Sequence, residues 1–150
     1  MNFWGRYPGK VDKNNRTTFP AKFREQTGDD NLLIANWFEQ SLVILPKDHG
    51  SLLIEDLQKE SILSPQVREL ESFIMGGAQE IELDIDGRFV IPEPLITYAT
   101  ITEKVVFKGG MFYVRLWDID VCDNYEKITS LRSEDTAKRI ALITAKKKYE

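Results

Sequence analysis

An internal repeat constrains the fold of this 150-residue chain more than any other feature of its sequence. A shift of 72 residues, the step from Arg16 to Arg88, aligns two segments without a gap over roughly 40 residues. Four identical pairs coincide in this alignment: Gly5 with Gly77, Asp12 with Asp84, Arg16 with Arg88, and Pro20 with Pro92. Apolar positions keep the same offset, among them Val11 with Leu83, Phe19 with Ile91, and Phe23 with Leu95. Coincidence is the alternative, but a constant offset over this length favours two copies of one structural unit.

Each copy predicts the same order of elements. A first strand leads through a two-residue type I′ turn, at 14–15 or 86–87, into a returning strand; Asn15 and Gly87 tolerate the positive φ that this turn needs. The following proline ends the returning strand and suits the first turn of a helix. A second hairpin completes the copy. The predicted ranges are strands 7–11, 17–19, 32–36 and 41–45 with a helix at 21–26 in the first copy, and strands 80–85, 89–91, 104–108 and 112–117 with a poorer helix signal after Pro92 in the second.

Helices are predicted between and after the two copies. One amphipathic helix is expected around residues 52–57, a second from Ser64-Pro65 to the stop at Gly76-Gly77, a third around 119–125, and a last one from Ser133 to Lys148. Each copy is too small to bury a good core alone, so the two copies should share one barrel-like core. We expect four segments: a first repeat at 1–46, a helical insert at 47–76, a second repeat at 77–118, and a C-terminal helical segment at 119–150.

Composition excludes several classes of protein. The 20 basic and 24 acidic residues give a net charge of −4, which excludes a generally basic nucleic-acid binder but leaves room for a basic face on an acidic body. The single cysteine, Cys122, excludes an internal disulfide and a four-cysteine zinc site, and the single histidine, His49, removes most histidine chemistry. No apolar run approaches the roughly 20 residues that span a bilayer, and the first residues lack the apolar stretch of a signal peptide. We therefore expect a cytoplasmic protein with no membrane partner.

Two motifs of the form DxxxR occupy the same place in the two copies. The first is Asp12-Lys-Asn-Asn-Arg16 and the second is Asp84-Ile-Asp-Gly-Arg88, and a proline follows four residues after each arginine. One such motif carries little information, but two with a fixed offset resemble the paired motifs of the MraZ family. The resemblance covers residues 1–128, including the Leu116-Trp117-Asp118 ending of the second copy. It departs from the family pattern at Asn15, where glycine is usual, and leaves residues 129–150 unmatched.

The resemblance implies an α+β fold of two tandem AbrB-like swapped-hairpin half-barrels that share one β-barrel core. It implies a bacterial transcriptional regulator of the division and cell-wall gene cluster, without enzymatic activity and associated with the nucleoid. Such a regulator binds short direct repeats in double-stranded promoter DNA, assembles into a homo-oligomeric ring, and needs no cofactor or metal. By matching position, Arg16 and Arg88 inherit the role of contacting DNA, and Asp12 and Asp84 the acidic position of the motif.

Positive charge is concentrated in the first copy. Residues 1–24 carry six basic residues and one acidic residue, whereas the matched residues 77–100 carry one basic and five acidic residues. Because phosphate contacts need lysine and arginine, we expect the first copy to dominate DNA contact. The expected DNA-binding set is completed by Lys10, Lys13, Asn14 and Asn15. For Lys10 and Lys13 the alternative is ordinary solvated charge; Lys22 and Arg24 can equally solvate the outer face of the short helix that buries Phe23, and Arg6 is no stronger a candidate.

Arginine at a turn suits DNA recognition, because its planar fork can bind guanine O6 and N7 with about 1–3 kcal/mol of discrimination. An aspartate four residues earlier could orient that fork. The alternative is that Asp12 and Arg16 form only a surface ion pair that closes a hairpin. The resemblance favours DNA contact.

A second class of function stays open. AbrB-like barrels also occur as antitoxins that sequester a partner, and the MraZ family is linked to control of an RNA methyltransferase encoded nearby. The acidic second copy and the basic C-terminal residues would suit such a protein-interaction module. It should co-purify with its neighbour-encoded protein and bind DNA only nonspecifically.

Other polar residues are interpreted as structural. Glu80, Glu82 and Asp84 alternate with apolar residues, which indicates a metal site or, as we favour, the solvated face of a half-buried strand. The residues Asp118, Asp120 and Asp123 lack EF-hand spacing and are interpreted as helix-start and surface charges. Gly76-Gly77 and Gly109-Gly110 lack phosphate-loop spacing. We expect His49 on the surface, Cys122 half-buried in a helix, and packing rather than base stacking for Trp4, Trp37 and Trp117.

Overall fold

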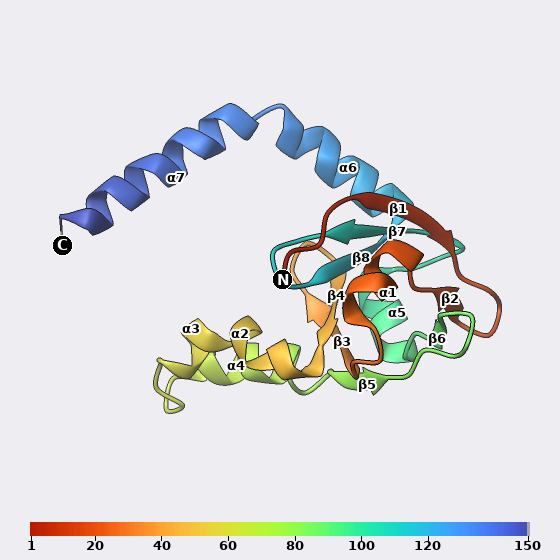
Figure 1. Ribbon diagram of the computed structural model, residues 1–150. Helices are drawn as coiled ribbons and strands as arrows, with labels where there is room; N and C mark the ends of the chain where they lie inside the picture. Colours follow the sequence, from red (N-terminus) through yellow and green to blue (C-terminus); the bar gives the residue numbers. More distant parts are fainter. Residues whose placement is uncertain (150) are drawn as a thin grey trace. The chain divides into compact units, whose positions relative to one another are not determined.

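The computed structural model describes residues 1–149, which form two compact units. The first unit, Met1–Ile119, is a mixed α and β structure built on antiparallel strands (Figure 1). The second unit begins at Asp120 and is helical. The two copies of the repeat both lie in the first unit.

The elements of the two copies correspond closely. The first copy contains β1 (Arg6–Lys10), β2 (Arg16–Thr18), α1 (Ala21–Thr27), β3 (Leu32–Trp37) and β4 (Ser41–Pro46). The second copy contains β5 (Gln79–Ile81), β6 (Arg88–Val90), α5 (Glu93–Ala99), β7 (Lys104–Gly109) and β8 (Val114–Asp118). When β2, α1 and β3 are shifted by the repeat offset of 72 residues, both ends of each coincide with the ends of β6, α5 and β7. The poorer helix signal after Pro92 thus corresponds to a regular helix, α5. Pro94 does not disrupt it, because it lies in the first turn, where proline is tolerated.

The strands of the two copies are exchanged. A six-stranded sheet has the order β1-β7-β8-β4-β3-β5, and a two-stranded sheet pairs β2 with β6, all antiparallel. Thus β1 pairs with β7 of the second copy, β5 pairs with β3 of the first, and β2 pairs with its own equivalent. The prediction of a paired hairpin across each DxxxR turn is wrong in this respect. Each copy is too small to bury a good core alone, and the exchange ties the strands of both copies to one shared core.

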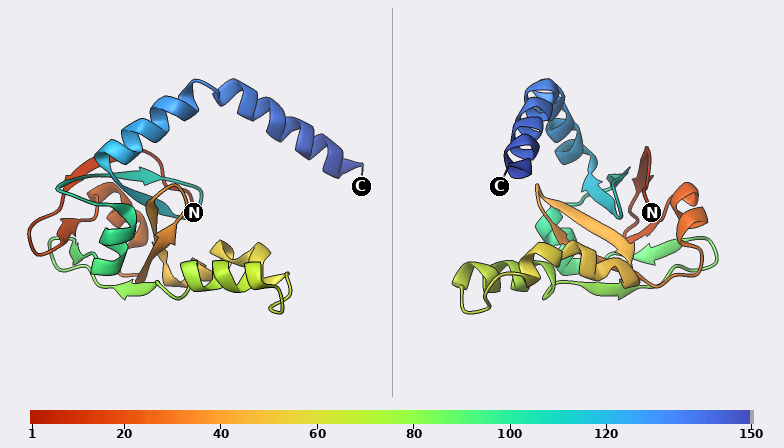
Figure 2. Two further views of the ribbon diagram at one scale, coloured as in Figure 1. Left: turned by 180° about the vertical axis from the view of Figure 1, so that it is seen from behind. Right: turned by 60° about the vertical axis from the view of Figure 1, so that its left-hand side comes forward.

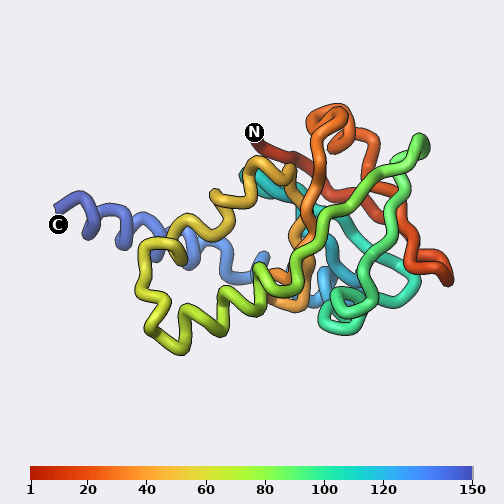
Figure 3. The backbone as a smooth tube through the Cα atoms, turned by 90° about the horizontal axis from the view of Figure 1, so that it is seen from below, coloured from red at the N-terminus to blue at the C-terminus, as the bar shows by residue number. Residues whose placement is uncertain are grey.

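The two turns also differ from the prediction. A three-residue connection, rather than a two-residue type I′ turn, joins Asp12 to Arg16 and Asp84 to Arg88. Only its last residue has positive φ, with 63° at Asn15 and 80° at Gly87. This arrangement fits a three-residue loop that ends in a left-handed residue, and it explains why one position per turn needs asparagine or glycine. Figures 1 and 3 show both connections projecting from the same end of the first unit.

The helical insert lies between the copies at the opposite end of this unit from the two turns (Figure 2). It contains η1 (Lys47–His49), α2 (Gly50–Leu53), α3 (Glu55–Gln58) and α4 (Pro65–Ile74). The single helix expected around residues 52–57 is broken at Ile54, whose φ of −115° is outside the helical range. The predicted start of α4 after Ser64 and its end before Gly76 are confirmed.

One hydrophobic core joins the two copies. It contains Phe19, Phe23 and Leu42 from the first copy together with Ile91 and Phe107 from the second, all with at most 1% of their surface exposed. The ring of Phe19 lies 6.0 Å from that of Phe107 and 6.5 Å from that of Phe89, both edge-on. This shared core fixes the strands that flank the two turns.

The second unit contains α6 (Ile119–Ser130), whose first residue belongs to the first unit, and α7 (Ser133–Lys148). The predicted start of the last helix at Ser133 is confirmed, and no residue of α7 is buried. Among residues 1–149, no helix has the length and apolar character required to cross a membrane.

Candidate nucleic-acid interface

The first DxxxR loop is closed by its aspartate. Oδ1 of Asp12 accepts the backbone N–H groups of Asn14 at 2.8 Å and Arg16 at 2.9 Å, and Oδ2 accepts Nε–H of Arg16 at 3.0 Å. The backbone adds bonds from Asp12 N to the Arg16 carbonyl and from Asn15 N to the Asp12 carbonyl. Aspartate suits this position because its short side chain reaches the backbone amides two and four residues ahead.

The second loop repeats this geometry with its own residues. Oδ1 of Asp84 accepts the N–H groups of Asp86 and Arg88, each at 2.9 Å, and Oδ2 accepts Nε–H of Arg88 at 2.9 Å. Gly87 N donates to the Asp84 carbonyl, as Asn15 does in the first loop. The two motifs therefore form the same turn, in which one carboxylate oxygen accepts two backbone N–H groups and the other accepts the arginine Nε–H.

Hydrogen bonding favours the charged form of both carboxylates. The backbone N–H of Arg16 is the main cause that lowers the pKa of Asp12 below its ordinary value of 3.8, with further help from Asn14 and the Arg16 side chain. The pKa of Asp84 is lowered in the same way, mainly by the backbone N–H of Arg88. The ionised carboxylate of each turn accepts the arginine Nε–H and so fixes that side of the guanidinium.

Strand exchange brings the two motif arginines onto one ribbon. In the β2–β6 pair, Arg16 lies opposite Val90 and Thr18 lies opposite Arg88, while Thr17 and its partner Phe89 point into the core. Because side chains alternate along a strand, Arg16, Thr18, Arg88 and Val90 share the outward face. The two arginines are diagonal neighbours on that face, within reach of each other's long side chains. This juxtaposition was not predicted from the sequence.

The free ends of the two arginines differ. Their side chains are similarly exposed, 42% for Arg16 and 44% for Arg88. Among residues 1–149, Asp12 is the only hydrogen-bond or ion-pair partner of the Arg16 side chain and binds it at Nε, which leaves the two Nη atoms without a protein acceptor. The Nη2 atom of Arg88 lies 3.5 Å from Asp86. The first loop therefore offers the more available fork.

The position of Arg24 differs from the prediction that the positive charges of the first copy stay with the first loop. From the sequence, Arg24 was counted with the first copy and considered as a solvated helix residue. In the structure it is half-buried, and its guanidinium lies against Gly87 of the second loop. A Cβ atom on Gly87 would stand 2.5 Å from Arg24 Cζ and 2.6 Å from Nε. One positive charge of the first copy therefore lies against the second loop, and a side chain at position 87 would displace this guanidinium as well as adopt an unfavourable φ.

The remaining predicted residues surround the first loop. Lys10, Lys13 and Asn14 are exposed, and Asn15 is half-buried. The Asn15 carbonyl accepts Ile91 N at 2.8 Å, just as the Gly87 carbonyl accepts Phe19 N at 2.8 Å, so each loop is tied to the other copy. Lys10 lies opposite exposed Lys104 across the β1–β7 pair, which adds a basic residue that was not predicted from the sequence.

The carboxylates considered as a metal site have separate partners. Glu80 forms an ion pair with Lys47, and Asp84 belongs to the loop just described. The strand that was predicted to run over residues 80–85 ends at Ile81, and Ile85 is almost fully exposed. Within the described 149 residues, no group of three or more histidine, cysteine, aspartate or glutamate side chains could hold a metal ion.

Several residues outside the loops have structural roles. Asp118 lies directly before α6, as a helix-start charge would, but it is buried rather than on the surface, and it accepts hydrogen bonds from Thr102 N at 3.0 Å and Oγ1 at 2.8 Å. Trp117 is buried, and its indole N–H donates to the Glu39 carbonyl at 3.0 Å. Trp4 is 80% exposed and so is not a core residue of the single chain. Cys122 is buried, more than the half-buried position predicted.

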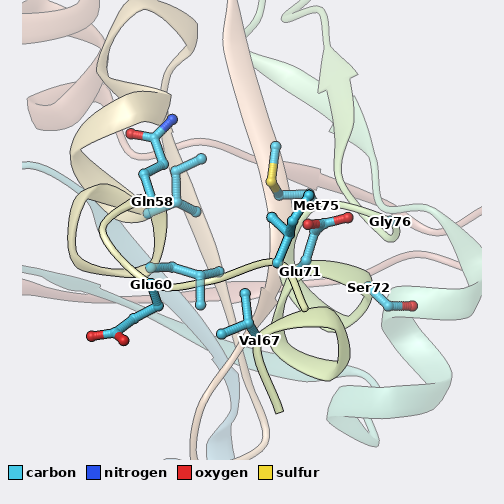
Figure 4. A pocket seen from close by; sticks show the side chains of 10 residues that line it. Gln58, Glu60, Val67, Glu71, Ser72, Met75 and Gly76 are labelled. Carbon is cyan, nitrogen blue, oxygen red and sulfur yellow. The ribbon is translucent and has the colours of Figure 1, made fainter. Parts of the chain in front are cut away.

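A groove of about 780 Å³ lies in the helical insert. Figure 4 shows Val67 and Met75 lining it together with the acidic side chains of Glu60 and Glu71. Nearby Ile62 is 69% exposed. This feature lies away from the two loops and is apolar with acidic edges, so it does not extend the basic ribbon.

Comparison with known proteins relates the chain to a bacterial family. A family profile described as "MraZ protein, putative antitoxin-like" matches residues 74–143. Relatives named transcriptional regulator MraZ include one from Oenococcus oeni, 33% identical over 89% of this chain and 90% of its own length. One from Leuconostoc citreum is 30% identical over 90% of this chain and 94% of its own, and one from Clostridium tetani is 32% identical over 82% and 86%. Alignments of this length include residues from both copies of the repeat.

Proposed function

This chain belongs to the MraZ family, and from that premise we propose that it is a bacterial transcriptional regulator that binds DNA through the β2–β6 ribbon and its two DxxxR loops. The observation that carries the proposal is the placement of Arg16 and Arg88 on one outward ribbon face, each held at Nε by an aspartate. Binding rather than catalysis is the proposed activity.

The ribbon has the shape and chemistry for a major groove. That groove admits a two-stranded β-ribbon, and an arginine fork matches the O6 and N7 acceptors of guanine. Because Asp12 and Asp84 fix the Nε side, each guanidinium is oriented before DNA arrives, which reduces the ordering cost of binding. Lys10, Lys13, Asn14 and Asn15 are proposed to contact phosphate and base edges around the first loop. A net charge of −4 is compatible with this, because only one face needs to be positive.

We propose that the fold is the AbrB-like swapped-hairpin type, with two half-barrels formed in one chain. Support comes from the exchange of β1 and β5 between the copies and from the β2–β6 pair that joins them. The proposed division remains a first repeat at 1–46, a helical insert at 47–76, a second repeat at 77–118 and a C-terminal helical segment at 119–150.

The proposed target is a set of short direct repeats in the promoter of the division and cell-wall gene cluster, and the proposed assembly is a homo-oligomeric ring associated with the nucleoid. A ring presents the same ribbon several times, so each contact after the first is effectively intramolecular. This would allow one modest ribbon per subunit to give tight, repeat-dependent binding.

The test is fluorescence anisotropy at fixed salt with the upstream DNA of the protein's own operon and a scrambled duplex. Arg16→Ala and Arg88→Ala should each weaken specific binding by roughly 5- to 150-fold, the range for one bidentate base contact. The matched control is Lys59→Ala, which removes the same charge just after α3, away from the ribbon, where Nζ of Lys59 lies 3.7 Å from Oδ1 of Asp56. The control should bind like the unmodified protein. Unchanged specific binding in the double arginine variant would refute the proposal.

A second candidate function is a protein-interaction module, either antitoxin-like or controlling an RNA methyltransferase encoded nearby. The observation that favours it is the apolar groove with acidic edges in the helical insert, away from the ribbon. This function predicts co-purification with the neighbour-encoded protein and equal, weak, salt-sensitive binding to both duplexes. Substituting Met75, which lines the groove, by aspartate should abolish co-purification if the groove is the binding surface.

A further inference from the structure

We infer that Ile85, at the tip of the second DxxxR loop, reads a thymine methyl group, so that the two loops of one chain recognise different features of DNA. The inference rests on the proposed function and assigns a specificity-determining residue to it. Ile85 is 97% exposed, whereas Ile81, on the same stretch of chain, is 7% exposed and part of the core. An isolated exposed isoleucine needs no explanation elsewhere on a surface, but this one lies within a loop that projects from the first unit (Figure 3).

The backbone around Ile85 is fixed before any ligand binds. Asp84, the preceding residue, accepts the N–H groups of Asp86 and Arg88 through Oδ1, and its carbonyl accepts Gly87 N. The guanidinium of Arg24 closes the side of the turn at Gly87. Isoleucine itself is branched at Cβ and therefore has few χ1 rotamers. The loop thus presents a stiff apolar group at small entropic cost on contact.

The charges beside Ile85 disfavour a phosphate as its neighbour. Glu82, Asp84 and Asp86 precede or follow it within three residues, and Asp86 also approaches Nη2 of Arg88. The equivalent position in the first loop is Lys13, which is exposed and cationic. Equivalent places in two loops of the same geometry therefore carry opposite chemistry: a cation that suits phosphate in the first and an apolar group among carboxylates in the second.

In the major groove, the group that suits an exposed aliphatic side chain is the C5 methyl of thymine, which is the apolar feature of the base edges. Contact would remove both the Ile85 side chain and the methyl group from water. Val90, 55% exposed on the outward ribbon face, extends the apolar character of the second copy. We therefore expect each bound repeat to contain one thymine whose methyl group matters to the second loop.

The experiment replaces each thymine of the operator in turn by deoxyuridine, which removes only the methyl group, and measures anisotropy with the unmodified protein, Ile85→Ala and Ile85→Lys. At one position per repeat the unmodified protein should lose about fourfold in affinity, the equivalent of roughly 0.8 kcal/mol for one buried methyl-sized group. Ile85→Ala should already have lost this factor and should not respond to deoxyuridine there. Ile85→Lys, which copies Lys13, should bind all duplexes more tightly, with a steeper salt dependence and no response to the methyl group.

The outcomes separate this inference from the proposed function. Specific binding that depends on Arg16 and Arg88 but responds to no thymine methyl, or an Ile85→Ala variant that keeps the full response, would overturn the role of Ile85 alone. Absence of specific binding in the unmodified protein would overturn both. Because Ile85 is almost fully exposed, its variants should unfold at the same temperature as the unmodified protein, which excludes loss of fold as the cause.

Discussion

Replacing Gly87 with alanine is predicted to destabilise the protein by about 1–2 kcal/mol, the cost of placing an ordinary residue in the left-handed region. Gly87 has a φ of 80° and closes the second DxxxR loop, where its N–H donates to the Asp84 carbonyl. Alanine can keep that hydrogen bond only by accepting the unfavourable φ. The loss should therefore appear in the free energy of unfolding rather than in the fold itself.

A second, smaller cost comes from Arg24. The new Cβ would stand 2.5 Å from Arg24 Cζ, so the guanidinium must move, although the end of a flexible side chain can do so. In an Arg24→Ala background this part of the cost disappears and only the dihedral part remains. A double-mutant cycle should therefore give a coupling of roughly 0.5 kcal/mol or more between positions 24 and 87.

The assay is urea unfolding at fixed protein concentration, monitored by far-ultraviolet circular dichroism. The matched control is Asn15→Gly at the equivalent position of the first loop, where φ is 63°. That change removes left-handed strain but adds unfolded-state entropy, so it should alter stability by less than about 0.5 kcal/mol. In thermal unfolding, the same destabilisation by Gly87→Ala should lower the melting temperature by about 2–4 °C per kcal/mol for a chain of this size. An unchanged midpoint for Gly87→Ala would refute the reasoning about the loop.

Three further predictions concern the loops and the core. The carboxyl ¹³C resonances of Asp12 and Asp84 should titrate with midpoints below pH 3.8, because backbone N–H groups stabilise both carboxylates; midpoints at or above 3.8 would contradict the hydrogen-bonding scheme. A pKa lowered in the folded state stabilises the protein at neutral pH, and this stabilisation is lost as the pH falls through that pKa. Tyr98→Phe should cost about 1 kcal/mol in a urea titration, because its hydroxyl donates to the Trp37 carbonyl at 2.6 Å; an unchanged stability would mean that water replaces the bond. Phe23→Ala should cost about 3–5 kcal/mol by the same titration, because Phe23 is buried among three rings with centroids 5.1 to 5.9 Å away, and a loss below 1 kcal/mol would show that this core readily collapses.

The sequence predicted the local elements well where one pattern decided them. The second hairpin of the first copy follows from two short apolar runs, and observed β3 and β4 extend the predicted strands by a single residue at their ends. In the second copy, β8 begins at Val114 rather than at the predicted residue 112. The start of α4 at Pro65 follows from proline chemistry at a helix N-terminus. The break at Ile54 was not predictable, because the leucines around it keep helical spacing and only the local backbone departs from it.

The partners of the short strands were beyond local patterns. β2 and β6 have three residues each, too few to reveal which strand they pair with, and the choice is made by the core that both copies share. The repeat offset was the available signal, since a unit that is duplicated can pair an element with its own equivalent. For the same reason, the juxtaposition of Arg16 with Arg88 and of Arg24 with Gly87 became visible only in the structure.

The most direct test of the central claim is amide hydrogen exchange of the whole protein with and without its upstream operon DNA. We predict slower exchange over residues 12–18 and 84–90, which form the two loops and the ribbon, with α4 of the helical insert (Pro65–Ile74) unchanged. Protection confined to the helical insert or to α7, with the ribbon exchanging as in the free protein, would contradict DNA binding through the paired DxxxR loops.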